Sequence, residues 1–318
     1  MRAVACGFTL GFLLAQLAPY QERGGSNYGW YRLGPDCQRG PYGVIANYDT
    51  AAAEIDHQLE AMYRNGQRRL RIPIYHGRGI GGGTVLDSKG GELTTRGRQN
   101  LRDLLAKIRS AGFVEILVTF VPTGANDPAR WTAFQQDYYD ENWALIRSLR
   151  PLIAAAGIPY RIDLWNEGSP HPRQRAALEY CQRLWNQYGS EYGTDDTVGF
   201  SIIPDPARLE LVASVYGDTP FGNHGDPPAF DLHFYASAQS RFEKALEILN
   251  AAGRRQPWIL GEAYCNDSAE AQALRQEIDS TGKRVLFLLQ WPLEASSSCR
   301  DVSITPPVDF GEYIARGF

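Results

Sequence analysis

The chain has 318 residues, of which 43% are hydrophobic, and this is enough apolar material for one large domain with a complete core. Its formal net charge is only −4, and no basic block interrupts the sequence. A chain of this charge lacks the lysine and arginine clusters that neutralise phosphate groups. The composition therefore argues against nucleic acid or an anionic membrane surface as a partner.

The first residues have the features of an export signal. Residues 3–18 are uncharged and mostly apolar, and they follow Arg2. This run is shorter than a comfortable membrane span. The alternative is a segment that stays attached and packs or frays. We expect a signal peptide over residues 1–18, a mature domain over residues 26–318, a secreted or periplasmic location, and no membrane association beyond export.

Cysteine usage leaves the redox state open. Removal of the signal would lose Cys6 and leave Cys37, Cys181, Cys265 and Cys299, which allow three complete pairings. Cys265 and Cys299 follow two consecutive predicted strands, so a bridge between their loops is one interpretation. Free buried thiols are the other.

Strand patterns and helix patterns alternate from residue 28 onward, with short breaks between them. Glycine directly follows several of the predicted helices, which is typical of a helix end. The predicted strands cover residues 28–33, 69–76, 113–122, 160–167, 197–204, 230–235, 258–264 and 284–291. The predicted helices cover residues 50–65, 98–111, 141–156, 173–188, 207–216, 241–252, 269–280 and 310–316.

This alternation predicts an α/β fold. Eight strand–helix pairs in one domain-length chain are typical of a (β/α)8 TIM barrel with a single domain. The main competitor is a doubly wound open sheet. No Gly-x-Gly-x-x-Gly turn follows the first predicted strand, and no change in composition marks a second domain. The barrel is therefore the favoured fold.

Alternation along the strands predicts which side chains face the barrel interior, because the apolar face should meet the helices. In the fourth strand this places Trp165 on the same interior face as Glu167. In the seventh strand it places Trp258 and Leu260 on the same face as Glu262. A buried charge costs several kcal/mol unless it is paired, so polar interior residues indicate either a functional site or a structural ion-pair network. The polar interior set is Arg71, Asp163, Glu167, His233, Tyr235 and Glu262.

Two glutamates stand out because each lies at a predicted strand tip among aromatic residues. Glu167 ends the fourth strand and Glu262 lies near the end of the seventh. Cleavage of a glycosidic bond with retention uses two carboxyl groups about 5 to 5.5 Å apart. One must carry a proton and the other must be ionised. A neighbouring arginine would keep one carboxylate charged, and an apolar, aromatic setting would raise the pKa of its partner.

The order of these motifs resembles glycoside hydrolase clan A, the barrel enzymes with catalytic carboxylates on strands four and seven. Within the clan the pattern is most similar to the cellulase family, glycoside hydrolase family 5, and the residues around Glu167 also resemble family 39. The matching motifs are Leu70-Arg71-Ile72-Pro73, Trp165-Asn166-Glu167, His233-Phe234-Tyr235, Gly261-Glu262 and Trp291, each on the expected strand.

The resemblance implies a retaining hydrolase of β-glycosidic bonds in a polysaccharide or oligosaccharide, acting as a monomer without a metal or other cofactor. It implies Glu167 as acid/base and Glu262 as nucleophile. It also implies supporting roles. Asn166 would donate to the sugar 2-hydroxyl, and Arg71 and Tyr235 would keep the nucleophile ionised. His233 would join the substrate or nucleophile network, and Trp291 would form a platform for the sugar. Further candidate platforms are Tyr31, Tyr75, Trp131 and Tyr264.

Other functions remain open from the sequence. A metal-dependent barrel hydrolase would need several His or Asp ligands at strand tips, and only His76 and His233 lie at predicted strand ends. A non-catalytic carbohydrate-binding barrel is the alternative outside the enzymes, although both carboxylates are present. Each candidate also has a structural alternative. Glu167 and Glu262 could be exposed loop carboxylates. His233 could be an interior histidine with satisfied hydrogen bonds, and Trp291 could pack in the barrel.

Overall fold

The computed structural model describes residues 23–34, 39–40, 42–79, 83–293 and 302–318. The expected signal peptide over residues 1–18 lies outside this described part, and so do Cys6, Cys37 and Cys299. The Cys265–Cys299 bridge therefore stays a prediction. Cys181 is a free, buried thiol that donates to the carbonyl oxygen of Gly168 at 3.2 Å.

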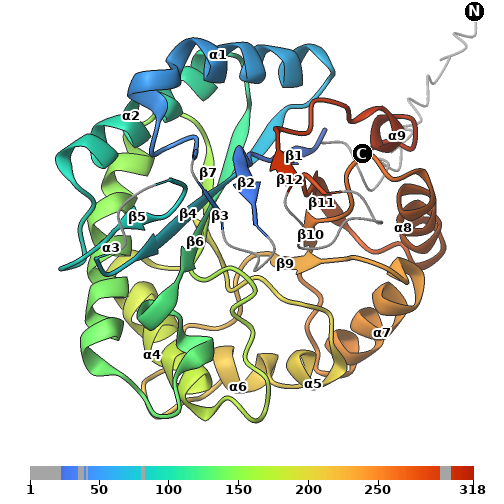
Figure 1. The fold of residues 1–318 in the computed structure, drawn as a ribbon. Coiled ribbons are helices and arrows are strands. Elements are labelled where there is room, and N and C mark those ends of the chain that lie inside the picture. The colour runs from blue at the N-terminus through green and yellow to red at the C-terminus, as the bar shows by residue number, and fades with distance from the viewer. Residues whose placement is uncertain (1–22, 35–38, 41, 80–82, 294–301) are drawn as a thin grey trace, which may run out of the picture.

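Eight parallel strands form the barrel, as predicted (Figure 1). Hydrogen bonding connects them in the order β8-β7-β6-β4-β1-β11-β10-β9. A parallel bridge between Ile202 and Leu232 joins the two ends of this order, so the sheet closes on itself. The strands are β1 (Gly25–Asn27), β4 (Arg69–Gly77), β6 (Glu115–Pro122), β7 (Tyr160–Asp163), β8 (Thr197–Gly199), β9 (Phe230–His233), β10 (Trp258–Glu262) and β11 (Val285–Gln290).

Helices surround this barrel and follow the predicted ranges within a few residues (Figure 1). Side chains of Thr94 and Asp267 accept backbone N–H groups at the starts of α2 and α8, which explains why those helices begin where they do. In the described part of the chain, no helix is both long and apolar enough to cross a bilayer. The helices are α1 (Tyr48–Arg64), α2 (Thr95–Ser110), α3 (Gln136–Ala154), α4 (Arg175–Tyr192), α5 (Pro206–Leu209), α6 (Val212–Tyr216), α7 (Ala238–Ala251), α8 (Ser268–Thr281) and α9 (Gly311–Ile314), with short 3₁₀ turns at Gly124–Asn126 and Pro128–Arg130.

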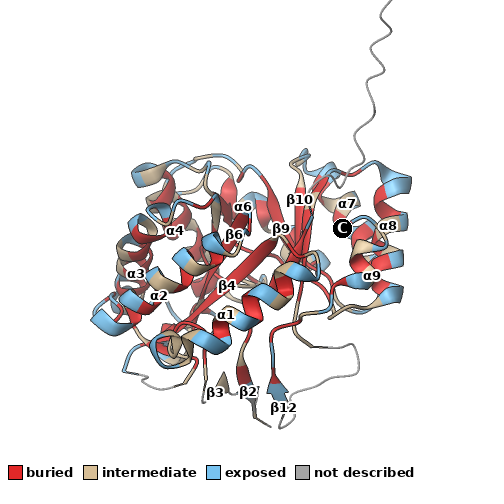
Figure 2. Ribbon diagram, turned by 90° about the horizontal axis from the view of Figure 1, so that it is seen from above, coloured by how far each residue is buried: buried red, intermediate tan, exposed pale blue. Residues whose placement is uncertain are grey.

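Apolar residues pack in two places relative to the strands. The large cluster lies between the outer face of the barrel and the helices, where the strands are buried on both sides (Figure 2). A smaller cluster includes one or two residues from each of several strands, and packed apolar layers of this kind fill the interior of such barrels. This smaller cluster consists of Leu117, Val198, Ala229, Ile259, Phe287 and Leu289.

The first predicted strand, over residues 28–33, is wrong. The barrel strand is β1, which ends at Asn27, and it reads Gly-Ser-Asn, so no apolar periodicity marks it. The tyrosine-rich stretch after it forms β2 (Tyr31–Leu33) instead. This strand pairs antiparallel with β3 (Arg39–Gly40) and with β12 (Val302–Ile304). The result is a separate three-stranded sheet, which Figures 1 and 2 place over one end of the barrel.

The predicted facing of β10 is wrong for two residues. Trp258 and Leu260 pack outward in the large cluster, and Ile259 points into the barrel. The register between β9 and β10 shifts between Leu260 and Glu262, which is the signature of a β-bulge. Because the bulge adds one residue, Glu262 faces the interior although its strand neighbours of the same parity face the helices.

The predicted facing of Trp165 is also wrong, because regular pairing of β7 ends at Asp163. Trp165 packs outward against Tyr180 of α4, with the two ring centroids 5.4 Å apart. Glu167 therefore lies past the strand end rather than on it. Its φ of 51° is left-handed, which is uncommon for a residue other than glycine.

The closeness of β1 to its neighbours gives a stability prediction. A Cβ added at Gly25 would lie 2.0 Å from the backbone oxygen of Arg69, so Gly25→Ala must force β1 and β4 apart. We expect a loss of at least about 3 kcal/mol in the free energy of unfolding. Denaturant unfolding measures it. Gly40→Ala is the matched control, because nothing lies within 4 Å of its added Cβ. Equal stability of the two variants would contradict the tight β1 packing.

Candidate active site

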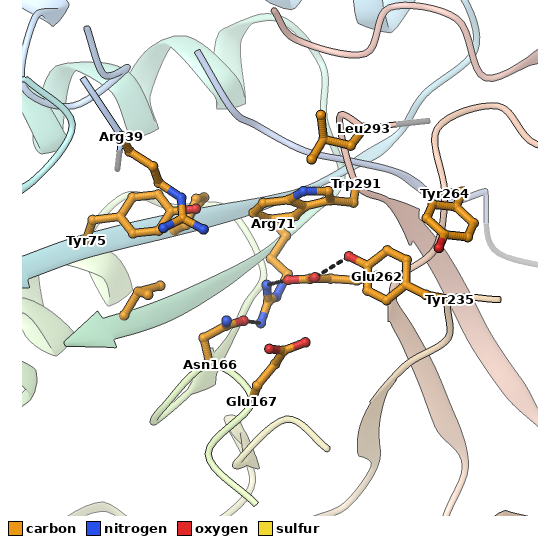
Figure 3. A pocket seen from close by; sticks show the side chains of 12 residues that line it. Arg39, Arg71, Tyr75, Asn166, Glu167, Tyr235, Glu262, Tyr264, Trp291 and Leu293 are labelled. Carbon is orange, nitrogen blue, oxygen red and sulfur yellow. Dashed lines mark hydrogen bonds and ion pairs between the residues drawn. The ribbon is translucent and has the colours of Figure 1, made fainter. Parts of the chain in front are cut away.

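A pocket of about 260 Å³ is lined by barrel residues together with Arg39 of the three-stranded sheet (Figure 3). Most of the residues predicted for a site line it together. Tyr75 and Tyr264 also line it, whereas Tyr31 and Trp131 do not. Arg39 and Leu293 line it without having been anticipated. The predicted residues in its wall are Arg71, Asn166, Glu167, Tyr235, Glu262 and Trp291.

Arg71 on β4 joins the strands beneath this pocket. Its fully buried guanidinium donates at 2.7 Å to Glu262 Oε1, to Asp163 Oδ2 and to Asn166 Oδ1. It also donates to Asn27 Oδ1 at 3.1 Å. The partners come from β10, β7, the loop after β7, and β1. A single planar cation with five donors therefore fixes groups from four separate parts of the barrel.

Two buried aspartates complete the charge balance around Arg71. Asp163 also accepts from Thr119 Oγ1 at 2.7 Å and from the backbone N–H of Ser201 at 3.0 Å. Asp231 lies 3.8 Å from Arg71 Nε and 3.8 Å from His233 Nε2. Asp231 was not among the polar interior residues named from the sequence. The Asp-x-His spacing on β9 was the available signal, since alternate residues share one face.

Backbone contacts fix the position of Glu167. The N–H of Asn166 donates to the carbonyl oxygen of Phe120 at 2.8 Å, and the N–H of Glu167 donates to Ser201 Oγ at 2.6 Å. A non-glycine residue at φ 51° is held in a sparsely populated conformation, and such residues concentrate at functional sites. The side chain is 35% exposed and faces the pocket, where a bound molecule can reach it.

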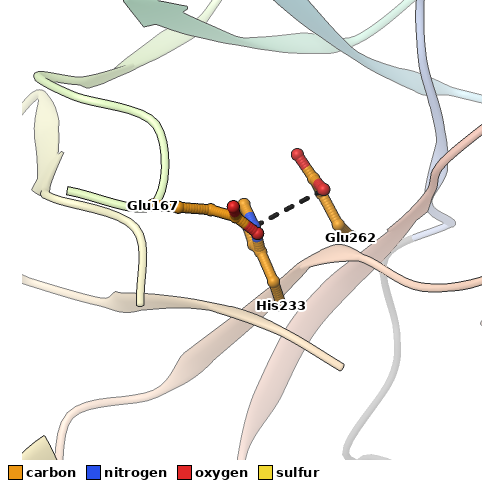
Figure 4. Close-up of side chains that lie close together, drawn as sticks. All are labelled: Glu167, His233 and Glu262. Carbon is orange, nitrogen blue, oxygen red and sulfur yellow. Dashed lines mark hydrogen bonds and ion pairs between the residues drawn. The ribbon is translucent and has the colours of Figure 1, made fainter. Parts of the chain in front are cut away.

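His233 lies between the two glutamates (Figure 4). Its Nδ1 is 3.2 Å from Glu167 Oε1 and 3.5 Å from Glu262 Oε2. One oxygen of each glutamate and a ring nitrogen all lie within 4.8 Å of one another. The structure therefore brings together the two carboxyl groups that the sequence separates by almost a hundred positions.

The pKa directions of the two glutamates are opposite to the predicted ones. Burial raises the pKa of the Glu262 carboxyl, and the charges of His233 and Arg71 offset only part of this effect. Burial acts in the same direction on Glu167, but the hydrogen bond and charge of His233, with the charge of Arg71, lower the pKa of Glu167 overall. The expectation gave His233 a place in the substrate or nucleophile network but did not consider its effect on the pKa of Glu167.

His233 is the group of this cluster that carries a proton at neutral pH. Burial opposes its charge, but the carboxylates of Glu262, Asp231 and Glu167 raise the pKa of His233 to about 10. The ring is therefore an imidazolium at neutral pH and donates to Glu167 through Nδ1–H. The same two carboxylates and imidazole are the groups in the described residues that could hold a metal ion. A metal would have to displace this proton and compete with the guanidinium 2.7 Å from Glu262 Oε1.

Two tyrosines form the wall beside Glu262. The Tyr235 hydroxyl donates to Glu262 Oε2, and its ring centroid is 5.0 Å from that of Tyr264. The backbone N–H of Tyr264 donates to Glu270 Oε2 at 2.6 Å, and its carbonyl oxygen accepts from the Tyr313 hydroxyl at 2.7 Å. Glu270 and Tyr313 thus position the wall from behind, a role that their sequence context did not indicate.

Comparisons with known proteins were made by family, by sequence and by structure. No family model matches the chain, and no curated protein matches its sequence. Several solved structures share its fold. The exo-β-1,4-mannosidase Op5Man5 from Opitutaceae bacterium strain TAV5 aligns with TM-score 0.53 and 14% identity over 85% of this chain, which spans about half (52%) of that protein.

Two further structures align over similar lengths. The endoglucanase Cel5A of Pseudomonas stutzeri has TM-score 0.52 and 14% identity, with 82% of this chain and 84% of that one covered. The β-mannanase of Thermomonospora fusca has TM-score 0.50 and 14% identity, with 87% and 86% covered. At these identities the likeness shows a shared (β/α)8 barrel fold.

The buried network gives a prediction at Arg71. Arg71→Met would leave Asp163, Asp231 and Glu262 without their shared cation, and removal of one partner from a buried ion pair costs about 3 to 5 kcal/mol. We expect a loss of that order in the free energy of unfolding, measured by denaturant titration. Arg130→Met is the control, because the Arg130 side chain is 71% exposed. A loss below 1 kcal/mol at Arg71 would contradict a central role for this cation.

Glu270 gives a pH-dependent prediction. Burial raises the pKa of Glu270 from 4.5 to about 8, so the folded protein holds a proton there that the unfolded chain releases above pH 4.5. The contribution of this site to the free energy of unfolding therefore falls by up to about 1.4 kcal/mol per pH unit as the pH rises from about 4.5 to 8. Above pH 8 the contribution is constant. Glu270→Gln removes this loss.

We expect the stability of Glu270→Gln relative to the parent protein to rise between pH 5 and pH 8, and to stay level from pH 8 to pH 9. Unfolding titrations at these three pH values measure it. Glu60→Gln at an exposed position controls for the loss of one carboxyl group. A difference that does not change with pH would mean that Glu270 is already ionised in the folded protein.

Proposed function

We propose that this protein is a retaining β-glycoside hydrolase that acts on a polysaccharide or oligosaccharide through double displacement. The observation that carries the proposal is the separation of Glu167 and Glu262, whose oxygens lie within 4.8 Å of each other beside an aromatic-lined pocket. Retaining enzymes place their carboxyl groups about 5 to 5.5 Å apart, whereas inverting enzymes need about 6.5 to 9.5 Å to admit a water molecule.

Glu262 is the proposed nucleophile because both of its oxygens are held. Arg71 binds Oε1 and Tyr235 binds Oε2, which fixes the carboxylate plane toward the pocket. In the first step a Glu262 oxygen attacks the anomeric carbon and the bond to the leaving oxygen breaks. The leaving oxygen takes a proton from Glu167, which receives it from the His233 imidazolium.

Glu167 is the proposed acid and base. His233 donates to it in the free protein and can pass its proton to Glu167 as charge develops on the leaving oxygen. In the second step a water molecule attacks the anomeric carbon, Glu167 takes a proton from that water, and the ester bond to Glu262 breaks. The proton then returns from Glu167 to His233, which restores the free protein. Formation of the ester removes the charge of Glu262, which lowers the pKa of Glu167 and favours its second role as a base.

Two further residues are proposed to hold the sugar. The carbonyl oxygen of the Asn166 side chain is taken by Arg71, so its amide N–H group is left to donate to a hydroxyl beside the anomeric carbon. Trp291 lines the same pocket and supplies an apolar ring against which a pyranose can stack.

The structural neighbours support the same substrate class, because their names describe an exo-mannosidase, an endoglucanase and a mannanase. We therefore propose membership of glycoside hydrolase clan A, with family 5 as the nearest family. Export through the apolar segment over residues 3–18, and a monomeric state, are part of this proposal.

Substitution of the two glutamates tests the mechanism. We expect Glu167→Ala and Glu262→Ala each to lose at least about 10²–10⁴-fold in kcat/KM on aryl β-glycosides and on β-1,4-mannan and β-1,4-glucan oligosaccharides. Azide should partly restore both variants. Glu167→Ala should give a β-glycosyl azide through the covalent intermediate, and Glu262→Ala an α-glycosyl azide through direct displacement. Proton NMR of the products distinguishes the two.

The control is Glu210→Ala, an exposed glutamate that does not line the pocket. Unchanged turnover in either pocket variant would remove that residue's role. An initial product of inverted configuration from the parent protein would contradict double displacement. Oligosaccharide binding without any turnover would favour a carbohydrate-binding protein instead.

A further inference from the structure

Arg39 reaches the pocket from outside the barrel. It belongs to β3, in the three-stranded sheet over the barrel end, and its side chain lines the same pocket as Glu167 and Glu262. Figure 3 shows the Arg39 side chain beside the ring of Tyr75, on the other side of the pocket from Tyr235 and Tyr264. The cation therefore belongs to the part of the pocket away from the tyrosine wall.

Aromatic stacking holds this guanidinium in place. Its central carbon lies 4.7 Å from the centroid of Tyr75 and 5.7 Å from that of Tyr31. These two rings pack edge to face with their centroids 6.2 Å apart, so the support is itself rigid. Stacking uses the flat face of a guanidinium, and the Tyr31 side chain takes one of its hydrogen bonds, so the other N–H groups at its edge stay available to a ligand.

Glu262 attracts the charge of Arg39 but does not contact it. Among the described residues no carboxylate forms an ion pair with it, and its buried Nε has no hydrogen-bond partner. The nearest carboxylates are already engaged, since Glu262 is bound by Arg71 and Tyr235 and Glu167 by His233. Because Arg39 is only partly buried and lines the pocket, a carboxylate from outside the chain can reach its guanidinium and form the direct ion pair that the described residues do not supply.

We propose that Arg39 binds the carboxylate of a uronic acid unit, so that the substrate is an anionic β-linked glycan. This inference rests on the proposed function and names its substrate class. A carboxylate fits the fork of a guanidinium through two parallel hydrogen bonds, whereas neutral hydroxyls would leave the charge uncompensated. The aromatic and carboxyl groups of the pocket bind the sugar ring, and Arg39 selects its acidic substituent.

Matched oligosaccharides that differ in one functional group test this. β-1,4-Tetraglucuronate and cellotetraose share linkage and ring configuration and differ only in a carboxylate or a hydroxymethyl group at C5. β-1,4-Tetramannuronate and mannotetraose form a second pair. Binding is measured by titration calorimetry on Glu167→Gln protein, which removes turnover from the readout, and kcat/KM is measured on the parent protein.

We expect the uronate of at least one pair to bind 10- to 100-fold more tightly than its neutral partner. Arg39→Gln should reduce that ratio to about one, and Arg39→Lys should keep part of it, because a lysine retains the charge without the fork. Arg130→Gln, which removes an exposed arginine, should keep the whole ratio. A variant that merely folds poorly would weaken both ligands of a pair and leave their ratio unchanged.

The outcomes separate this inference from the proposed function. Hydrolysis of neutral oligosaccharides with no uronate preference would overturn the role of Arg39 and leave the hydrolase. Uronate binding that depends on Arg39 without turnover would retain the inference and remove the hydrolase. Tighter, Arg39-dependent binding of 6-sulfated cellotetraose than of tetraglucuronate would overturn the carboxylate in favour of a sulfate ester. No binding of any ligand overturns the inference.

Discussion

The ion cluster around Arg71 is the constraint on which the site depends. A guanidinium with no exposure to water is stable only while its carboxylate partners surround it, and those partners come from strands on different sides of the barrel. The ring of strands must close before the cluster can form. The same cluster then fixes Glu262 on β10 and Asn166 in the loop after β7, so the interior of the fold and the site share one set of interactions.

Within this frame, His233 determines how protons are distributed. It stands between two carboxylates that would otherwise repel each other, and its charge makes their close approach possible. A cluster of three groups that share a proton titrates as a unit rather than as separate residues. The chemistry proposed for Glu167 and Glu262 is therefore a property of the trio, which explains why arguments from each glutamate's own neighbours gave the wrong pKa directions.

The fold could be predicted because seven of the eight barrel strands carry an apolar pattern, and the polar residues that interrupt it fall on interior faces. β1 was missed because Gly-Ser-Asn has no such pattern and is defined only by the strands beside it. The pocket residues Arg71, Glu167, Tyr235 and Glu262 were predicted from position and motif. The outward facing of Trp258 and Leu260 was not predicted, because a bulge depends on pairing with the neighbouring strand and does not change the alternation of residue types in the sequence.

The three-stranded sheet joins segments that are more than 260 positions apart, since β12 pairs with β2. Contacts of such long range are slow to form, and during synthesis they cannot form until the last of their strands has left the ribosome. The strands that bear the paired glutamates are complete earlier. Arg39 itself needs only the short-range pairing of β3 with β2, so the last strand to be made does not place this side chain but completes the sheet around it.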